Sequence, residues 1–465
     1  MSSAQKNILL GLLITTFLAA IEVTIISTAM PTIINDLGGF ELLSWVYAVY
    51  LLTSAVSVPI WGKLSDLYGR KRLFLIGIAI FLVSCTLCAF AQTMEQLIVF
   101  RFLQGIGAGA ANTLSFSIIA DNFDFAHRAK AQSWLSAVWG VAGILGPLAG
   151  GLLVDYLSWH WVFLVNLPFG LAAMWMIGRN LHETREPRKV IIDYGGTVTF
   201  TLGIGALLYA LLSIGGGEAG VELPHPAMIP LLLLVAAVFL FLFILIERRH
   251  PEPMLPLDML RQRGVLIPNI SGFLYSFVLI ALTAYFPLWI QNVLRLGATY
   301  SGMTLIPISL SWLVGAILCS RLLAKRSILF VAILGGIFVL LGSLPLAFLQ
   351  PSTPNWLLIG TVFVIGLGFG IIASVSTLTV QSSVAKANRG AAGSSVNLSR
   401  TLGQTIGVAV FGVVLNTSIS NASDSTAAMA SGIQAIFLGT VLISALLFVS
   451  AFFFPKEAKY KTAAE

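Results

Sequence analysis

Charge is scarce in this sequence. Only 10% of its 465 residues are Asp, Glu, Lys or Arg, and 57% are apolar, whereas an average soluble domain has about 25% charged residues. A soluble fold of this length needs charged side chains to cover its surface, and disordered or nucleic-acid-binding chains fit the composition no better. The mean hydropathy is +0.94, and apolar stretches recur at about the 20-residue length that crosses a bilayer as a helix. The scarcity of charge therefore predicts a polytopic membrane protein.

Cysteine and histidine are scarce as well. The three cysteines, Cys85, Cys88 and Cys319, lie inside apolar runs, so a disulfide scaffold is excluded and we expect them to pack as small apolar side chains. The five histidines lie in or beside the connections, which indicates neither a metal site nor the polar cluster of an integral membrane enzyme. No glycine-rich string of the form G-x-x-x-x-G-K-S/T occurs, so we expect no nucleotide and no cofactor.

Fourteen apolar segments are long enough to be transmembrane helices. The first continues to Met30 and contains Glu22, which favours a membrane helix over a cleaved leader. Turn-forming or charged residues separate the segments. The predicted segments are 7–30, 44–61, 73–91, 96–118, 132–154, 161–178, 195–214, 228–246, 266–289, 301–320, 328–349, 356–379, 394–415 and 433–454.

The basic residues indicate the orientation of these segments. If the N-terminus is cytoplasmic, 23 of the 26 Lys and Arg residues lie in inner connections or tails, Arg295 lies outside, and Arg101 and Arg400 lie within the membrane. Cytoplasmic loops of membrane proteins carry such an excess of basic residues. The alternation also requires an even number of spans, so both termini are predicted to be cytoplasmic.

The two longest inner connections, near 179–194 and 247–264, flank the seventh and eighth segments. This spacing predicts an all-α membrane protein in a 6+2+6 arrangement: an N-terminal six-helix bundle, a linker with two inserted helices, a C-terminal six-helix bundle and a cytoplasmic tail. Paired bundles with a site between them are a transporter architecture. The predicted limits of the four parts are residues 1–180, 181–263, 264–455 and 456–465.

The connection between the second and third segments combines two glycines, an acid and a basic cluster. It reads Gly62-Lys-Leu-Ser-Asp66-Leu-Tyr-Gly69-Arg70-Lys71-Arg72. Glycines permit a tight turn, the acid can accept hydrogen bonds at a helix start, and the cations anchor the turn to the inner leaflet. A simple topological anchor would have the same cations. The whole string resembles the loop signature of the major facilitator superfamily, which implies the major facilitator fold.

Three further stretches resemble the fourteen-helix drug:proton antiporters of that superfamily. They begin at Arg101 in the fourth segment, at Gly140 in the fifth and at Trp159 before the sixth. Two features depart from the subfamily: its usual aspartate in the first helix is Glu22 here, and the equivalent loop of the second bundle has no acid. A generic packing face of small residues is the alternative reading of the fifth segment. The resemblance implies an antiporter motif formed by Gly143, Gly146, Pro147, Gly150 and Gly151.

Glu22 is the one acid of 19 that clearly lies deep within a predicted span. A charge at that depth costs at least about 2.5–3.5 kcal/mol on insertion scales, so a buried carboxyl group is a candidate functional site by default. Loss of hydration favours a neutral carboxylic acid, which lets such a group load and release protons. We expect Glu22 and Arg101 to carry proton coupling, with Arg101 either paired to Glu22 or ordering nearby polar groups. A Glu22 that is always protonated, and an Arg101 that only ties helices together, are the alternatives.

A second charged group is predicted at the cytoplasmic ends of the helices. Asp121 ends the fourth segment, and in the superfamily an acid at this place commonly meets the loop arginine. The resemblance therefore implies an inner gate cluster that latches the outward-open state, with a solvated loop charge as the alternative for Asp121. The expected members are Gly62, Asp66, Gly69, Arg70, Lys71, Arg72 and Asp121.

Aromatic and uncharged polar residues are the candidates for binding a substrate. Arg400 lies near the cytoplasmic end of its predicted span, where it can snorkel to the interface or line a cavity mouth. With Glu22 as the one deep acid, the composition favours lipophilic cations. Each aromatic residue is also consistent with a core or lipid-facing position. The candidate cavity residues are Gln104, Asn112, Trp139, Tyr275, Asn397 and Arg400.

These features predict a transporter and not an enzyme. We expect a proton-coupled antiporter that exports lipophilic, often cationic drugs or toxic compounds across the cytoplasmic membrane of a bacterium by alternating access. Its expected partners are small amphipathic molecules, protons and the lipid bilayer, without nucleic acid, cofactor or metal, and a monomer should suffice. An exporter of one endogenous lipid, peptide or metabolite is the main alternative, and an integral membrane enzyme is a remote one.

Overall fold

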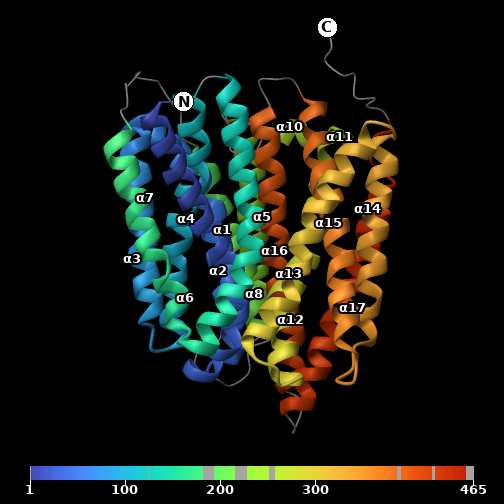
Figure 1. The fold of residues 1–465 in the computed structure, drawn as a ribbon. Coiled ribbons are helices and arrows are strands. Elements are labelled where there is room, and N and C mark those ends of the chain that lie inside the picture. Colours follow the sequence, from blue (N-terminus) through green and yellow to red (C-terminus); the bar gives the residue numbers. More distant parts are fainter. Residues whose placement is uncertain are drawn as a thin grey trace.

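The computed structural model describes residues 2–123, 125–181, 193–214, 228–250, 257–384, 389–420 and 425–456. Within these ranges the regular structure is helical, without strands, and fourteen helical spans are long and apolar enough to cross a membrane. The fourteen predicted spans are therefore confirmed. Because fourteen successive crossings return the chain to the side where it started, α1 begins and α17 ends at the same end of the bundle (Figure 1).

The helices fall into three groups along the chain. The first six spans contain α1 (Ser3–Leu37), α2 (Leu43–Tyr68), α3 (Arg70–Ala89), α4 (Met94–Asn122), α5 (Phe125–Tyr156), α6 (His160–Leu164) and α7 (Asn166–Asn180). The next two are α8 (Tyr194–Ile214) and α9 (Met228–Glu247). The short α10 (Leu257–Leu260) precedes the last six, which contain α11 (Arg263–Ile280), α12 (Phe286–Leu288), α13 (Ala298–Leu323), α14 (Ile328–Ser343), α15 (Asn355–Ser383), α16 (Arg389–Ser420) and α17 (Ser425–Ala451).

Prolines interrupt two spans that the sequence predicts to be continuous. The sixth span breaks between Leu164 and Asn166 because Pro168 has no N–H to donate to the carbonyl of Leu164. The ninth span contains π-helical segments at Ala281–Tyr285 and Trp289–Val293, on either side of the short α12 that holds Pro287. A missing donor changes the hydrogen-bond register, and π turns absorb the change.

The helices pack as two bundles with an inserted pair. Helices α1 to α7 contact one another, as do α11 to α17, while α8 packs on α9 and also contacts α2 and α16 (Figure 1). The pair thus lies against both bundles. The four predicted domain limits stay a prediction, since several of them fall at or beside residues outside the described ranges, and the predicted tail 456–465 is described only at Lys456.

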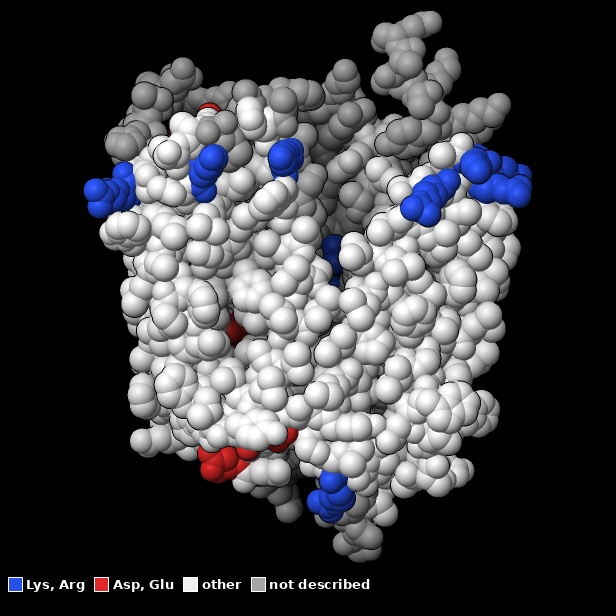
Figure 2. Space-filling view, in the orientation of Figure 1, with Lys and Arg blue, Asp and Glu red and all other residues white. Residues whose placement is uncertain are grey.

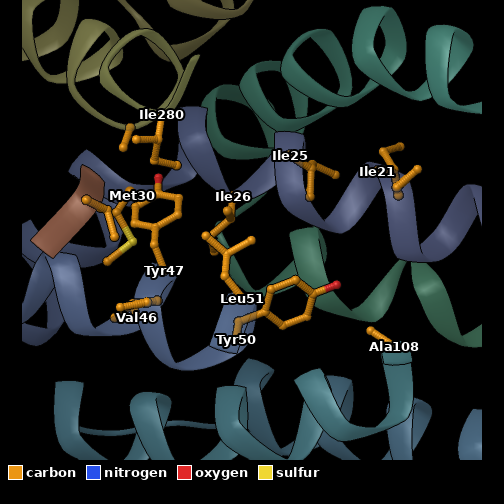
Figure 3. Close-up of a cluster of buried hydrophobic side chains, with 14 of the residues drawn as sticks. Ile21, Ile25, Ile26, Met30, Val46, Tyr47, Tyr50, Leu51, Ala108 and Ile280 are labelled. Carbon is orange, nitrogen blue, oxygen red and sulfur yellow. The ribbon is translucent and has the colours of Figure 1, made fainter. Parts of the chain in front are cut away.

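The two bundles meet along an outer seam between α5 and α13, where small residues bring the backbones together. A side chain at Gly151 would lie 2.6 Å from the carbonyl oxygen of Ala298, and one at Gly302 would overlap the backbone of Pro147. Both positions therefore require glycine. The bundles also meet through apolar packing elsewhere, where Ile280 of α11 lies beside Met30 of α1 and Tyr47 of α2 (Figure 3).

An acid from one bundle caps a helix of the other at the outer end of this seam. The carboxylate of Asp155, near the end of α5, accepts hydrogen bonds from the backbone N–H groups of Ala298 (3.2 Å) and Thr299 (2.7 Å) at the start of α13. An anion at a helix N-terminus satisfies free donors and interacts favourably with the helix dipole. Asp155 thus ties the two bundles together across the seam.

The opposite end of the molecule is open between the bundles. Figure 2 shows a recess between the two halves at the end where Lys and Arg side chains gather. By the charge rule that orients the chain, this is the cytoplasmic end. The structure therefore represents an inward-open arrangement, closed along the outer seam.

Replacing Asp155 with Ala should shift the molecule toward the outward-open arrangement. Loss of a helix cap costs about 0.5–2 kcal/mol, which corresponds to roughly a 2- to 30-fold change in the ratio of the two states. Spin labels on cysteines placed at the exposed outer residues Gln92 and Gln350, in a background without native cysteines, should report longer distances in this variant. Asp155→Asn keeps an acceptor oxygen and is the control; equal shifts in both variants would show that the cap is not the cause.

Candidate functional site

A buried acid forms the centre of the first bundle. Glu22 lies in the middle of α1 with 0% of its surface exposed, and Arg101 of α4 is 1% exposed. The Nη1 atom of Arg101 donates to Oε1 of Glu22 over 2.6 Å. The structure thus brings the two predicted proton-coupling residues into one ion pair. Buried charges persist only when they are paired and hydrogen-bonded, and this pair meets that requirement.

Neighbouring polar groups complete the coordination of both charges. Asn166, the first residue of α7, donates through Nδ2 to Oε2 of Glu22 over 3.0 Å. Nη1 of Arg101 also donates to Oε1 of Gln104 at 2.7 Å, and its guanidinium carbon lies 4.0 Å from the ring centre of Tyr50. Each oxygen of the carboxylate therefore has one donor, and the cation is solvated by protein groups instead of water.

Two residues in this network differ from the sequence-based expectation. Gln104 is proposed from the sequence to line a substrate cavity, but its side chain is fully buried between Arg101 and the thiol of Cys85, to which its Nε2 donates over 3.1 Å. Asn166 was given no role from the sequence. The sequence feature that could have identified Asn166 is a polar amide inside an apolar span, at the break that Pro168 causes in the sixth helix.

The glycines of α5 face two different neighbours. Gly146 and Gly150 lie against Thr24 and Thr28 of α1, and Gly143 and Gly151 face α13 of the other bundle. Thr24 also donates through Oγ1 to the carbonyl of Ala142 over 3.2 Å. Thus α5 lies between the helix that carries Glu22 and the seam that closes the outer side. Pro147, the fifth residue of the predicted motif, presents its carbonyl to the seam at Gly302.

The charged loop forms a cluster within the first bundle. Arg70 pairs with Asp66 at 3.4 Å and with Asp121, and it donates to the carbonyl of Ser117 at 2.6 Å. Gly69, between α2 and α3, has a φ of 96°, which favours glycine, whereas Gly62 has ordinary spacing to Thr113. The remaining predicted members are Lys71, which is half-buried, and Arg72, which is exposed.

These contacts join α2, α3 and α4 of a single bundle, and they exist while the outer seam is closed. The latch expected from the sequence, in which breaking this cluster allows inward opening, stays a prediction. A gate that acts between bundles would need a further partner at the inner end of the second bundle.

The other proposed substrate residues differ in how far they are exposed. Trp139 is 44% exposed, Asn112 is half-buried, and Tyr275 is fully buried. Asn397 is exposed and Arg400 half-buried, one turn apart on the same face of α16. Among the described residues, no three His, Cys, Asp or Glu side chains lie close enough to hold a metal ion.

Arg400 lies inside the candidate membrane span of α16, which runs over Ala392–Ile419. It is about two turns, or about 12 Å, from the start of that span. Its guanidinium carbon is 5.5 Å from the ring centre of Tyr275, and that ring is 5.8 Å from Phe369, the middle residue of α15. The contact of the guanidinium with this buried ring favours the cavity-lining alternative for Arg400 over snorkelling.

The Glu22–Arg101 pair predicts a specific order of stabilities. Glu22→Leu leaves a guanidinium that cannot lose its proton, and breaking a buried pair costs about 3–5 kcal/mol, whereas replacing both partners with apolar residues is often neutral. We expect Glu22→Leu to lower the thermal unfolding midpoint in detergent most, Arg101→Met less because the acid can take up a proton, and the double variant to recover. A double variant that unfolds at the temperature expected from adding both losses would show that the pair contributes no coupling.

The chain is similar in sequence and in fold to known membrane transporters. The model of the Major Facilitator Superfamily matches residues 12–408. Multidrug resistance protein 3 of Bacillus subtilis (strain 168) is 37% identical over 422 residues, covering 90% of this chain and 81% of the relative. Multidrug transporter protein MdtP of the same organism is 33% identical over 470 residues, covering 99% and 86%. A bacterial homolog of the human lysosomal transporter Spinster, solved inward-facing and unoccupied, has a TM-score of 0.67 at 15% identity, covering 98% of both chains.

Proposed function

Because this chain belongs to the major facilitator superfamily, we propose that it is a multidrug exporter that moves lipophilic drugs or toxic compounds out of the cell in exchange for protons. That it is a multi-pass membrane transporter and not an enzyme follows from the family and from the fourteen spans. Support for drug export comes from the two Bacillus subtilis relatives, both of which carry the names of multidrug proteins.

The observation that supports proton coupling best is the complete burial of Glu22 among polar partners. An ionised Glu22 is held by one donor on each oxygen, from Arg101 and Asn166. A proton on the carboxyl group removes the attraction to Arg101, yet the guanidinium keeps its contacts with Gln104, Tyr50 and the carbonyl of Val46. Both protonation states of Glu22 therefore leave Arg101 solvated by the protein, which is what a carrier of protons requires.

Asn166 offers an acceptor for the proton. Its Oδ1 atom is buried and makes no hydrogen bond with the described residues. A turn of the amide would present this oxygen to a protonated Glu22, but it would remove the bond that Nδ2 donates to the carbonyl of Phe163 at 3.2 Å. We propose that this exchange of hydrogen bonds accompanies loading and release of the proton.

Helix α5 provides a direct connection from this site to the outer seam. Glu22 lies on α1 between Ile21 and Thr24, the residues that contact Gly146 of α5. Two other glycines of α5, Gly143 and Gly151, contact α13. A small shift of α1 on protonation must move α5, because packed backbones cannot absorb the shift by compression. We propose that this displacement opens the seam and so couples the proton to alternating access.

We further propose that the cluster of Asp66, Arg70 and Asp121 acts at the cytoplasmic end as part of an inner gate. It holds α2, α3 and α4 as one unit, so the inner ends of these helices would close against the second bundle together. The proposed location is the cytoplasmic membrane of a bacterium, since the two named relatives come from Bacillus subtilis. Each bundle contributes to one recess within a single chain, which supports a functional monomer.

Proton coupling at Glu22 predicts the behaviour of two variants. With purified protein in liposomes and an imposed pH gradient, Glu22→Gln should reduce proton-driven transport of a lipophilic dye to the level of protein-free liposomes, because the amide cannot exchange protons. Dye binding should be retained, since Gln keeps an acceptor for Arg101. Glu22→Asp is the control, because it keeps an acid that is one methylene shorter and should retain measurable transport.

Unchanged transport in Glu22→Gln would contradict the assignment of coupling to this residue. Loss of both dye binding and transport would instead indicate that the substitution disrupts the bundle. Transport by the wild type that does not respond to the pH gradient would contradict proton coupling altogether.

A further inference from the structure

The second bundle contains an unpaired positive charge at membrane depth. Among the described acids, none forms an ion pair with Arg400, whose recorded contact is the ring of Tyr275. A cation–π contact orients a guanidinium but leaves its charge unneutralised. The first bundle differs, because its embedded arginine is matched by Glu22. An ionisable side chain at this depth is costly to retain without a partner, and it therefore indicates a binding role.

Residues of a neighbouring helix hold the side chain of Arg400 in place. Its aliphatic stem lies on α11, where a side chain at Gly272 would be 3.5 Å from Cγ of Arg400. The guanidinium lies over Tyr275. Asn397, on the same face of α16 and one turn nearer the cytoplasm, is exposed. The polar face of α16 therefore leads from the inner end of the molecule, where the recess opens (Figure 2), toward Arg400.

Tyr275, the ring beside Arg400, belongs to a group of three aromatic side chains. Tyr275, Trp312 and Phe369 contact each other in a triangle with ring separations of 6.0, 5.8 and 5.6 Å. Trp312 is half-buried, so one face of the triangle is accessible. A fixed cation beside aromatic surface matches a molecule with one anionic group and an apolar body.

The environment of Glu22 weakens the argument for the preference for cations expected from the sequence. That expectation depends on Glu22 as a negative charge available to the substrate. In the structure Glu22 is fully buried in the first bundle and neutralised by Arg101. No other acid among the described residues lies deep within a span. The formal charge that the described part of the recess can offer to a substrate is therefore that of Arg400.

We propose that Arg400 binds the carboxylate of lipophilic organic acids, and that these form the substrate class of the exporter. The guanidinium presents paired donors that match the two oxygens of a carboxylate, while the apolar body of the acid lies against Trp312. This inference rests on the proposed export function and specifies the substrate of the same recess. It also explains why the second bundle retains a charge that its own residues leave unpaired.

The test compares three probes of one shape: 2-naphthoate, 2-naphthamide and 2-naphthylmethylammonium. Binding to the purified protein is measured by calorimetry for the wild type, Arg400→Gln and Arg400→Lys. The wild type should bind 2-naphthoate at least about tenfold more tightly than the ammonium probe, and Arg400→Gln should lose at least about tenfold for 2-naphthoate alone, the range for truncating one partner of a buried charge pair. Arg400→Lys should recover part of the affinity, since it keeps the charge without the paired donors.

Arg321 provides the matched control, because it is an exposed arginine at the inner end of α13 in the same bundle. Arg321→Gln should leave all three affinities unchanged. A thermal unfolding midpoint within a few degrees of the wild type would show that Arg400→Gln is folded, and Arg400→Lys carries the test if it is not. Equal binding of acetate and 2-naphthoate would overturn the proposal in favour of a simple anion site.

Two further outcomes separate this inference from the proposed function. If the wild type transports a lipophilic dye with the pH gradient but binds the ammonium probe as tightly as 2-naphthoate, and Arg400→Gln changes neither, the substrate class is wrong and export stands. If 2-naphthoate binds through Arg400 but no substrate moves with the gradient, the binding site stands and proton-driven export is wrong.

Discussion

The ion pair between Glu22 and Arg101 is the interaction on which the rest of the structure depends. Two charges inside a helical bundle are tolerable only because Asn166, Gln104 and Tyr50 replace the water that both have lost. This set draws on α1, α2, α4 and α7, so the charge state of one carboxyl group is linked to the packing of most of the first bundle. A proton is a small ligand, but at this depth it changes a large electrostatic energy.

Small residues on α5 connect the helix that carries Glu22 to the partner bundle through close packing. Different glycines of α5 contact α1 and α13, so α5 packs closely against both the acid-bearing helix and the partner bundle. The seam is also tied by Asp155 at the start of α13. Close backbone packing transmits displacements and excludes water, and both properties are needed if protons are not to leak while the recess changes sides.

The two bundles differ in charge although they share a fold. The first contains a balanced pair in its core, and the second contains Arg400 beside an aromatic triangle at the edge of the recess. Such a division separates the group proposed to handle protons from the group proposed to hold the substrate. In the proposed mechanism, exchange depends on movement of the bundles and not on direct contact between proton and substrate.

The sequence by itself determined the fourteen spans, their orientation and the single deep acid, because apolar length and the placement of Lys and Arg are properties of the chain read one segment at a time. The resemblance of the loop to the superfamily signature also implied the cluster of Arg70 with Asp66 and Asp121. Only the tertiary structure decided which groups share a site. Asn166 reaches Glu22 because a helix breaks before Pro168, the glycines of α5 divide between two neighbours, and Arg400 of α16 lies over Tyr275 of α11. These outcomes depend on contacts between residues far apart in the chain, which no local pattern encodes.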